Sequence, residues 1–134
     1  MYPLKFRNIY YEKPWGSNKL SEYRSDIVKE NIGESWEIAC HDKGMTEVSN
    51  GKFEGEALIS VINKMKKMLL GDKIFKDKFF NKDFPLLIKL ISAGENLSVQ
   101  VHPNNQYAQL KENDNGKIEA WYILSVDDGA EIIV

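Results

Sequence analysis

The sequence predicts a strand-dominated domain, either all-β or α+β, with one clear helix. Segments in which apolar and polar residues alternate recur at 35–41, 97–102 and 116–124, and alternation with a period of two is typical of strands with one buried face. A nearly continuous apolar segment at 84–92 indicates a strand buried on both faces. Only residues 57–70 repeat their apolar side chains at three- and four-residue steps, as an amphipathic helix does.

The remaining elements follow in chain order. Residues 2–12 alternate and are rich in aromatic side chains, which favours an initial strand, and Pro14 with Gly16 marks a turn after it. We expect the helix to end at Gly71. A short helix is expected near 104–111, with turns at 112–116 and 127–129. Residues 130–134 begin another strand.

Composition and charge fit a soluble globular protein, which we expect to form a single domain over residues 1–134. Hydrophobic residues make up 43% of the chain and charged residues 28%. The formal net charge of -2 argues against general nucleic-acid binding, which depends on a basic surface. Residues 1–10 lack the apolar core of a signal peptide or membrane span. Cys40 is the single cysteine, so no intramolecular disulfide is possible and a reducing, cytoplasmic location is expected.

The segment after residue 96 carries the candidate metal ligands. Alternation places Ser98, Gln100 and His102 on one face of the predicted strand and leaves the intervening apolar residues for the core. An imidazole two residues from a carboxamide brings two donors within reach of one ion. The alternative is an ordinary exposed strand face, because this pair alone does not specify a metal site.

A third donor lies in the strand predicted over 116–124. Alternation puts Glu119 on the same face as Lys117 and Trp121. A loop or short helix across 104–115 would let the two strands bring Glu119 to Gln100 and His102. Alternatively, Glu119 is an edge-strand charge. We expect the other histidine, His41, to be a surface residue, because it lies on a different predicted strand.

Lys89 is anomalous because it interrupts the apolar segment at 84–92. A lysine in a strand buried on both faces must either reach water with its ammonium or accept a cost of desolvation. We therefore expect Lys89 to have an oppositely charged partner or a functional role.

Four segments together resemble the type I mannose-6-phosphate isomerase family, particularly its shorter bacterial form. They read KPWGSNKL at 13–20, GESWEIA at 33–39, PLLIKLISAGENLSVQVHP at 85–103 and GKIEAWYIL at 116–124. Their order is that of the family, which argues against a chance match. The resemblance implies a cupin-like jelly-roll β-barrel, incomplete here, and zinc-dependent interconversion of mannose 6-phosphate and fructose 6-phosphate through an enediol.

The resemblance also implies roles for individual residues. It matches the zinc ligands to Gln100, His102 and Glu119. It matches Lys89 and Lys117 to lysines near the reacting centre. It places Ser98 close to the substrate phosphate and Trp15 by the substrate pocket. The expected small-molecule partner is a phosphorylated sugar.

The resembled isomerases are considerably longer, and the part that this sequence lacks contains a further ligand histidine and a catalytic arginine. We therefore expect a chain truncated at its C-terminus, with an incomplete zinc site and impaired activity. The alternatives are a non-catalytic cupin-like module that binds metal or sugar, and one half of a split enzyme. An unfinished strand at 130–134 would leave an open sheet edge, which predicts a homodimer.

Overall fold

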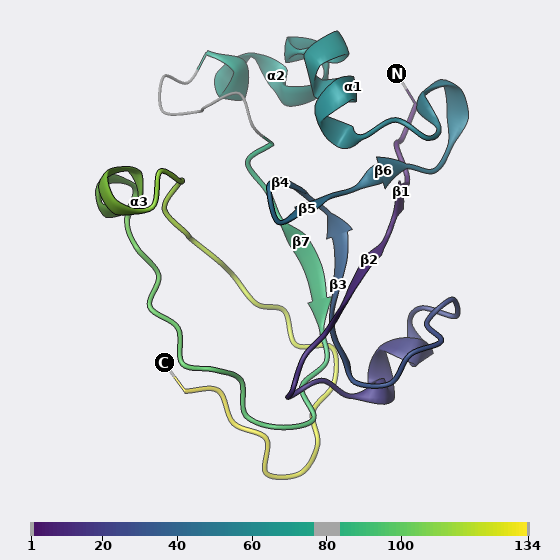
Figure 1. Cartoon of the computed structure of the whole chain (residues 1–134), viewed down its shortest axis with the longest axis vertical. Coiled ribbons are helices and arrows are strands. Elements are labelled where there is room, and N and C mark those ends of the chain that lie inside the picture. Colours follow the sequence, from purple (N-terminus) through teal and green to yellow (C-terminus); the bar gives the residue numbers. More distant parts are fainter. Residues whose placement is uncertain (1, 77–83, 134) are drawn as a thin grey trace. The chain divides into compact units, whose positions relative to one another are not determined.

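The computed structural model describes residues 2–76 and 84–133. The chain divides into two compact units, Met1–Leu97 and Ser98–Val134, and each is described here by itself. The class is mainly β with few helices, as predicted, and the sheets are not closed into a barrel (Figure 1). Within the described residues, no helix is both long and apolar enough to cross a membrane.

The first unit is built on a three-stranded antiparallel sheet in the order β2-β3-β7 (Figure 1). These strands are β2 (Ile9–Glu12), β3 (Ile32–Ile38) and β7 (Ile88–Ile91). Two short antiparallel pairs accompany it. They are β1 (Phe6–Arg7) with β6 (Glu47–Val48), and β4 (Cys40–His41) with β5 (Gly44–Met45). The predicted initial strand is therefore confirmed, as two short strands.

The strand predicted over 84–92 is shorter than expected. Only Ile88–Ile91 is a strand, and residues 86, 87 and 88 are 54%, 43% and 44% exposed. The prediction of burial on both faces is therefore wrong. Among the strands that the structure describes, β7 pairs only with β3 and lies at the edge of its sheet, so the sheet covers it less than it would cover a central strand.

The predicted helix over 57–70 is formed as two shorter helices. These are α1 (Leu58–Met65) and α2 (Lys67–Phe75), and they meet at Lys66, whose φ is 48°. Gly71 has a φ of 79° and interrupts helical geometry without ending α2. The apolar face of α1 is nonetheless buried, as the periodicity predicted, since Leu58 and Ile62 form a buried cluster with Cys40. Short 3-10 helices occur at Asn18–Glu22 and Gly51–Phe53.

The second unit contains the predicted short helix and none of the predicted strands. Helix α3 spans Asn105–Lys111, and the Asn104 side chain caps it by accepting a hydrogen bond from Tyr107 N at 2.9 Å. Residues 98–102, 116–124 and 130–133 are not strands; residue 134 lies outside the described residues. Val99 and Val101, expected in the core, are 99% and 91% exposed. A strand needs a neighbour for its backbone groups, and the described part of this unit supplies no ladder.

Candidate functional site

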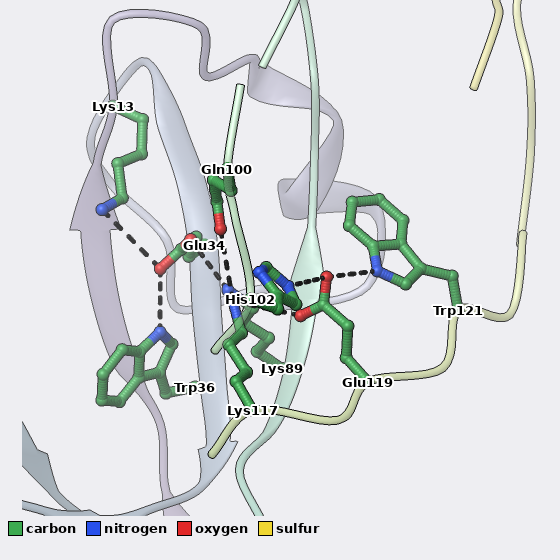
Figure 2. Close-up of polar contacts among 9 residues, drawn as sticks. All are labelled: Lys13, Glu34, Trp36, Lys89, Gln100, His102, Lys117, Glu119 and Trp121. Carbon is green, nitrogen blue, oxygen red and sulfur yellow. Dashed lines mark hydrogen bonds and ion pairs between the residues drawn. The ribbon is translucent and has the colours of Figure 1, made fainter. Parts of the chain in front are cut away.

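Glu119 is the centre of a group of polar side chains in the second unit (Figure 2). Its Oε1 lies 2.8 Å from His102 Nε2 and accepts a hydrogen bond from Trp121 Nε1 at 3.1 Å. Its Oε2 lies 3.1 Å from Lys117 Nζ. The side chains of Glu119 and His102 are 31% and 25% exposed, so the group is accessible to a ligand.

Gln100 joins this group through Lys117. The Lys117 ammonium donates a hydrogen bond to Gln100 Oε1 at 3.2 Å while it also contacts Glu119. The backbone brings the two segments together on either side of α3, because Lys117 N donates to Pro103 O at 3.0 Å and Gly116 N donates to Asn105 Oδ1 at 3.0 Å. The predicted convergence of residues 100, 102 and 119 is therefore present, although no strands carry it.

The hydrogen bonds around Glu119 favour its ionised form. Partial burial alone would raise the pKa of this carboxyl group, but donation from His102, Trp121 and Lys117, with the charge of Lys117, outweighs burial and lowers the pKa to about 2. Glu119 is thus a carboxylate throughout the neutral range. A deprotonated carboxylate is the form that ligates a metal ion.

The donors fit a divalent ion as a partial site. Within the described residues, no three or more His, Cys, Asp and Glu side chains gather where they could hold a metal ion. The group here has one histidine and one glutamate, and its third donor is a carboxamide. Because Gln100 Oε1 and Glu119 Oε2 both contact the same ammonium, they reach a single cation. Zinc sites with three protein ligands commonly contain two or three nitrogen or sulfur donors, so one nitrogen with oxygen donors is an incomplete set.

A second group of polar side chains lies in the first unit and includes Lys89 (Figure 2). Lys89 Nζ donates a hydrogen bond to Glu34 Oε1 at 3.0 Å, which confirms the expectation of an oppositely charged partner. Glu34 Oε2 accepts from Trp36 Nε1 at 2.9 Å and lies 3.7 Å from Lys13 Nζ. The Glu34 carboxylate therefore receives two cations and one indole N–H.

The other predicted site residues stand apart from these contacts. Ser98 is exposed and takes no part in the hydrogen bonds around Glu119. Trp15 is half-buried in the first unit, where its ring would lie 2.7 Å from a Cβ added at Gly33. His41 is partly buried in β4, and its Nδ1 accepts a hydrogen bond from Lys43 N at 3.1 Å.

Sequence reasoning missed Glu34, although a signal for it exists. Glu34 has the same strand parity as Trp36 and Ile38, which belong to an apolar face, so a charge at this position required a partner. The predicted strand began at Ser35, whereas β3 begins at Ile32 and includes Glu34. Position 34 therefore lay outside the predicted strand.

Fold and site together define a mainly β protein with a candidate site for a divalent cation. Residues 4–121 match the catalytic-domain model of type I phosphomannose isomerase, and the chain belongs to that family. Among curated relatives, it is 39% identical over 132 residues to a mannose-6-phosphate isomerase of Streptococcus mutans. That alignment covers 98% of this chain but 40% of the relative, so the chain spans about two fifths of that protein.

Solved structures agree with the family assignment. A crystal structure of the mannose 6-phosphate isomerase from Bacillus subtilis matches with a TM-score of 0.75 and 31% identity, over 87% of this chain and 35% of that one. A zinc-bound mannose 6-phosphate isomerase matches with a TM-score of 0.65 and 28% identity, over 82% of this chain and 28% of that one. The predicted cupin-like fold, in incomplete form, is confirmed.

Proposed function

We propose that this chain is part of the catalytic domain of a zinc-dependent isomerase that interconverts mannose 6-phosphate and fructose 6-phosphate. Membership of the family supports the reaction, and the names of the relatives support the substrates. The observation that carries the proposal for the site is the meeting of Gln100 and Glu119 oxygens at one ammonium, with His102 against the same carboxylate.

Gln100, His102 and Glu119 would hold the zinc ion. A zinc-bound structure among the solved neighbours supports the choice of metal. When it is bound, the chemistry that such an ion supplies is Lewis-acid stabilisation of negative charge on sugar oxygens. Three protein donors with a single nitrogen make a weak set for zinc, so we expect low affinity in this chain.

The reaction moves one proton between neighbouring carbons of the open-chain sugar. The proton on C2 of mannose 6-phosphate leaves, its electron pair forms the C1=C2 bond of the enediol, and the C1 oxygen gains a proton. The O2 proton then leaves, C1 gains a proton, and C2 becomes the carbonyl carbon of fructose 6-phosphate. Negative charge develops on O1 and O2 during these steps, so a fixed cation lowers their barriers.

We assign this cationic role to Lys89 and Lys117. Each is held by a carboxylate, Lys89 by Glu34 and Lys117 by Glu119, so each ammonium has a defined direction. An ammonium can stabilise an enediolate oxygen or pass a proton to it. We also propose that Ser98 donates its hydroxyl to a phosphate oxygen and that Trp15 borders the sugar, as the family resemblance implies.

We further propose that the chain alone turns over substrate more slowly than its longer relatives, because it matches 40% of their length. The alternative is a module that binds metal or sugar without turnover, or one half of a split enzyme. The predicted homodimer and the cytoplasmic location stay predictions. The strand at 130–133 that motivated the dimer is not formed.

Zinc content and isomerisation measured on the same purified chain test the proposal. We expect zinc to be retained and to be lost in the His102→Ala and Glu119→Ala variants. His41→Ala is the matched control, because His41 is the other of the two histidines and lies outside the proposed site. Zinc with mannose 6-phosphate turnover supports the isomerase, and zinc without turnover supports the binding module. Equal zinc loss in His41→Ala, or full retention in both site variants, would refute the assigned ligands.

A further inference from the structure

Glu34 is a nearly buried carboxylate whose described side-chain partners lie in β3, in β7 and just after β2. It is 8% exposed and lies in the central strand β3. A carboxylate in such a position is costly unless donors surround it. Lys89 supplies a donor to Oε1, and Trp36 and Lys13 approach Oε2. Burial would raise the pKa of Glu34, but these hydrogen bonds and charges outweigh it and lower the pKa.

The strand register fixes this arrangement. Trp36 lies directly opposite Lys89 in the β3–β7 pair, and Glu34 lies opposite Tyr11 in the β2–β3 pair. The Tyr11 and Trp36 rings pack with their centroids 4.7 Å apart. Gly44 packs against both rings, because a Cβ at that position would lie 2.6 Å from Tyr11 Oη and 2.7 Å from Trp36 Cζ3. The indole is therefore held on two sides, and it in turn holds the Glu34 carboxylate.

The Lys89 ammonium is paired with Glu34 and is still partly exposed. Its side chain is 21% exposed, and Glu34 occupies one of the three hydrogens that an ammonium carries. As far as residues 2–76 and 84–133 are concerned, the other two hydrogens stay available for an oxygen outside the sheet. With two lysines around one glutamate, the group keeps a net positive charge near neutral pH, which suits an anionic ligand.

We propose that Glu34 is a positioning residue that fixes the place and direction of the Lys89 ammonium, with Trp36 orienting the Glu34 carboxylate. Lys89 then meets a sugar oxygen as a preset cation rather than as a flexible side chain. The inference rests on the proposed function only in that Lys89 is taken to act on the sugar phosphate.

The position of Lys89 can be measured without any activity. Competitive acetylation of the chain followed by mass spectrometry reports the rate at each lysine, and a lysine held in a hydrogen bond by a partly buried partner reacts slowly. We expect Glu34→Gln to raise the rate at Lys89 several-fold and Glu34→Asp to raise it less. Glu37→Gln is the matched control, because Glu37 is a second carboxylate of the same strand and pairs with Arg24 instead.

The acetylation rate at Lys64 distinguishes unfolding of the variant from a local change at Lys89. Lys64 pairs with Glu56 in another part of the first unit. If Glu34→Gln raises the acetylation rates at both Lys64 and Lys89, the variant has unfolded. The test is then made with Trp36→Phe, for which we expect a smaller rise in rate, at Lys89 alone. An unchanged rate at Lys89 in a folded Glu34→Gln variant, or an equal rise in Glu37→Gln, would overturn the inference.

Kinetics separate this inference from the proposed function. Where mannose 6-phosphate turnover is measurable, Glu34→Gln should lower kcat by about 10-fold to 100-fold with little change in KM, since misplacing a reacting group has costs of this order. Glu34→Asp should recover part of kcat. A raised acetylation rate at Lys89 together with full activity of Lys89→Met would refute the role of Lys89 and leave the positioning by Glu34 intact.

Discussion

At the scale of single residues, two unusual positions in the sequence account for each other. Lys89 interrupts an apolar segment, and Glu34 has the parity of an apolar strand face. Their side chains meet at 3.0 Å across neighbouring strands. The need for a partner followed from the sequence, because a charge in a strand that faces the core is costly. The partner's identity did not, since it depends on the register between β3 and β7, and Glu34 and Lys89 lie 55 residues apart in the chain.

The ionisation of Glu34 predicts how stability depends on pH. Its pKa is lowered in the folded state, so the ion pairs stabilise the fold above the ordinary carboxyl range and are lost as pH falls through the folded value. We expect Glu34→Gln to lower the free energy of unfolding by about 1 to 3 kcal/mol at pH 7. The difference from the unsubstituted chain should shrink below about pH 4, where Glu34 is protonated in the unfolded chain.

Urea unfolding at a series of pH values measures this difference. Glu95→Gln is the control, because Glu95 is exposed and should show little change at any pH. A difference between the Glu34 variant and the unsubstituted chain that stays constant from pH 7 to pH 3 would show that the carboxylate charge is not what stabilises the sheet.

The candidate ligands show how far spacing alone predicts a site. Parity placed Lys117, Glu119 and Trp121 on one side, and the structure joins the three through Glu119. The convergence with His102 also followed from the sequence, because a short helix connects the two segments. The exposed apolar side chains at 99 and 101 did not follow, since alternation predicts a core face only where another layer covers it.

Trp121 supports Glu119 without being a proposed ligand, and its removal should weaken metal binding. We expect Trp121→Phe to lower zinc affinity by up to about 10-fold, because outer hydrogen bonds that orient a ligand carry effects of this order. Tyr122→Phe is the matched control, since Tyr122 is 87% exposed and is not bonded to Glu119. Isothermal titration with zinc measures both. Equal affinities in the two variants would mean that the indole does not orient the carboxylate.

At the scale of elements, the break between α1 and α2 shows what periodicity cannot detect. The apolar repeat runs through residues 57–70 without interruption, yet the helix breaks at Lys66. The φ of 48° and ψ of -123° at Lys66 are unfavourable for a residue with a Cβ. Side-chain pattern reports which face is buried and says nothing about a single strained backbone position.

Glycine at position 66 should therefore stabilise the first unit. We expect Lys66→Gly to raise the free energy of unfolding by about 0.5 to 1 kcal/mol, as relief of strain exceeds the added entropy of the unfolded chain. The neighbouring Lys67→Gly should lower it by about 0.5 kcal/mol, because Lys67 is helical. Chemical denaturation of both variants gives the comparison. Destabilisation of similar size in both would show that Lys66 is not strained in solution.

The absent strands of the second unit mark the limit of prediction at this scale. Helix α3 was predictable because its cap and hydrogen bonds are local, with Asn104 bonded to Tyr107. The alternating segments at 97–102 and 116–124 need partners distant in sequence, and the described residues of this unit provide no ladder for them. Local elements thus follow from local sequence, whereas strands depend on the rest of the fold.

At the scale of the whole molecule, exposed apolar side chains gather in the second unit. Val99, Val101, Ile118, Tyr122 and Ile133 are each between 87% and 99% exposed. Soluble proteins seldom leave so many large apolar residues uncovered in one short segment. The curated relatives are more than twice as long as this chain. We therefore expect the part of their sequence that this chain does not match to cover these apolar residues.

We therefore expect complementation in trans. Mixing the chain with the portion of the Streptococcus mutans isomerase that follows its match to this chain should produce mannose 6-phosphate turnover above that of either piece alone. It should also lower the fluorescence of a dye that binds exposed apolar surface. Both effects are expected because burial of apolar area drives the association.

A pair of valines tests whether the exposed residues of the second unit are responsible. Val101→Asp should abolish complementation, because a charge on the covered surface would be buried without a partner. Val28→Asp should leave it intact, since Val28 is 94% exposed in the first unit and comparable to Val101 at 91%. Light scattering on the chain alone distinguishes self-association, which also covers apolar surface. A monomeric chain with full isomerase activity, unaffected by the added segment, would show that these residues need no partner.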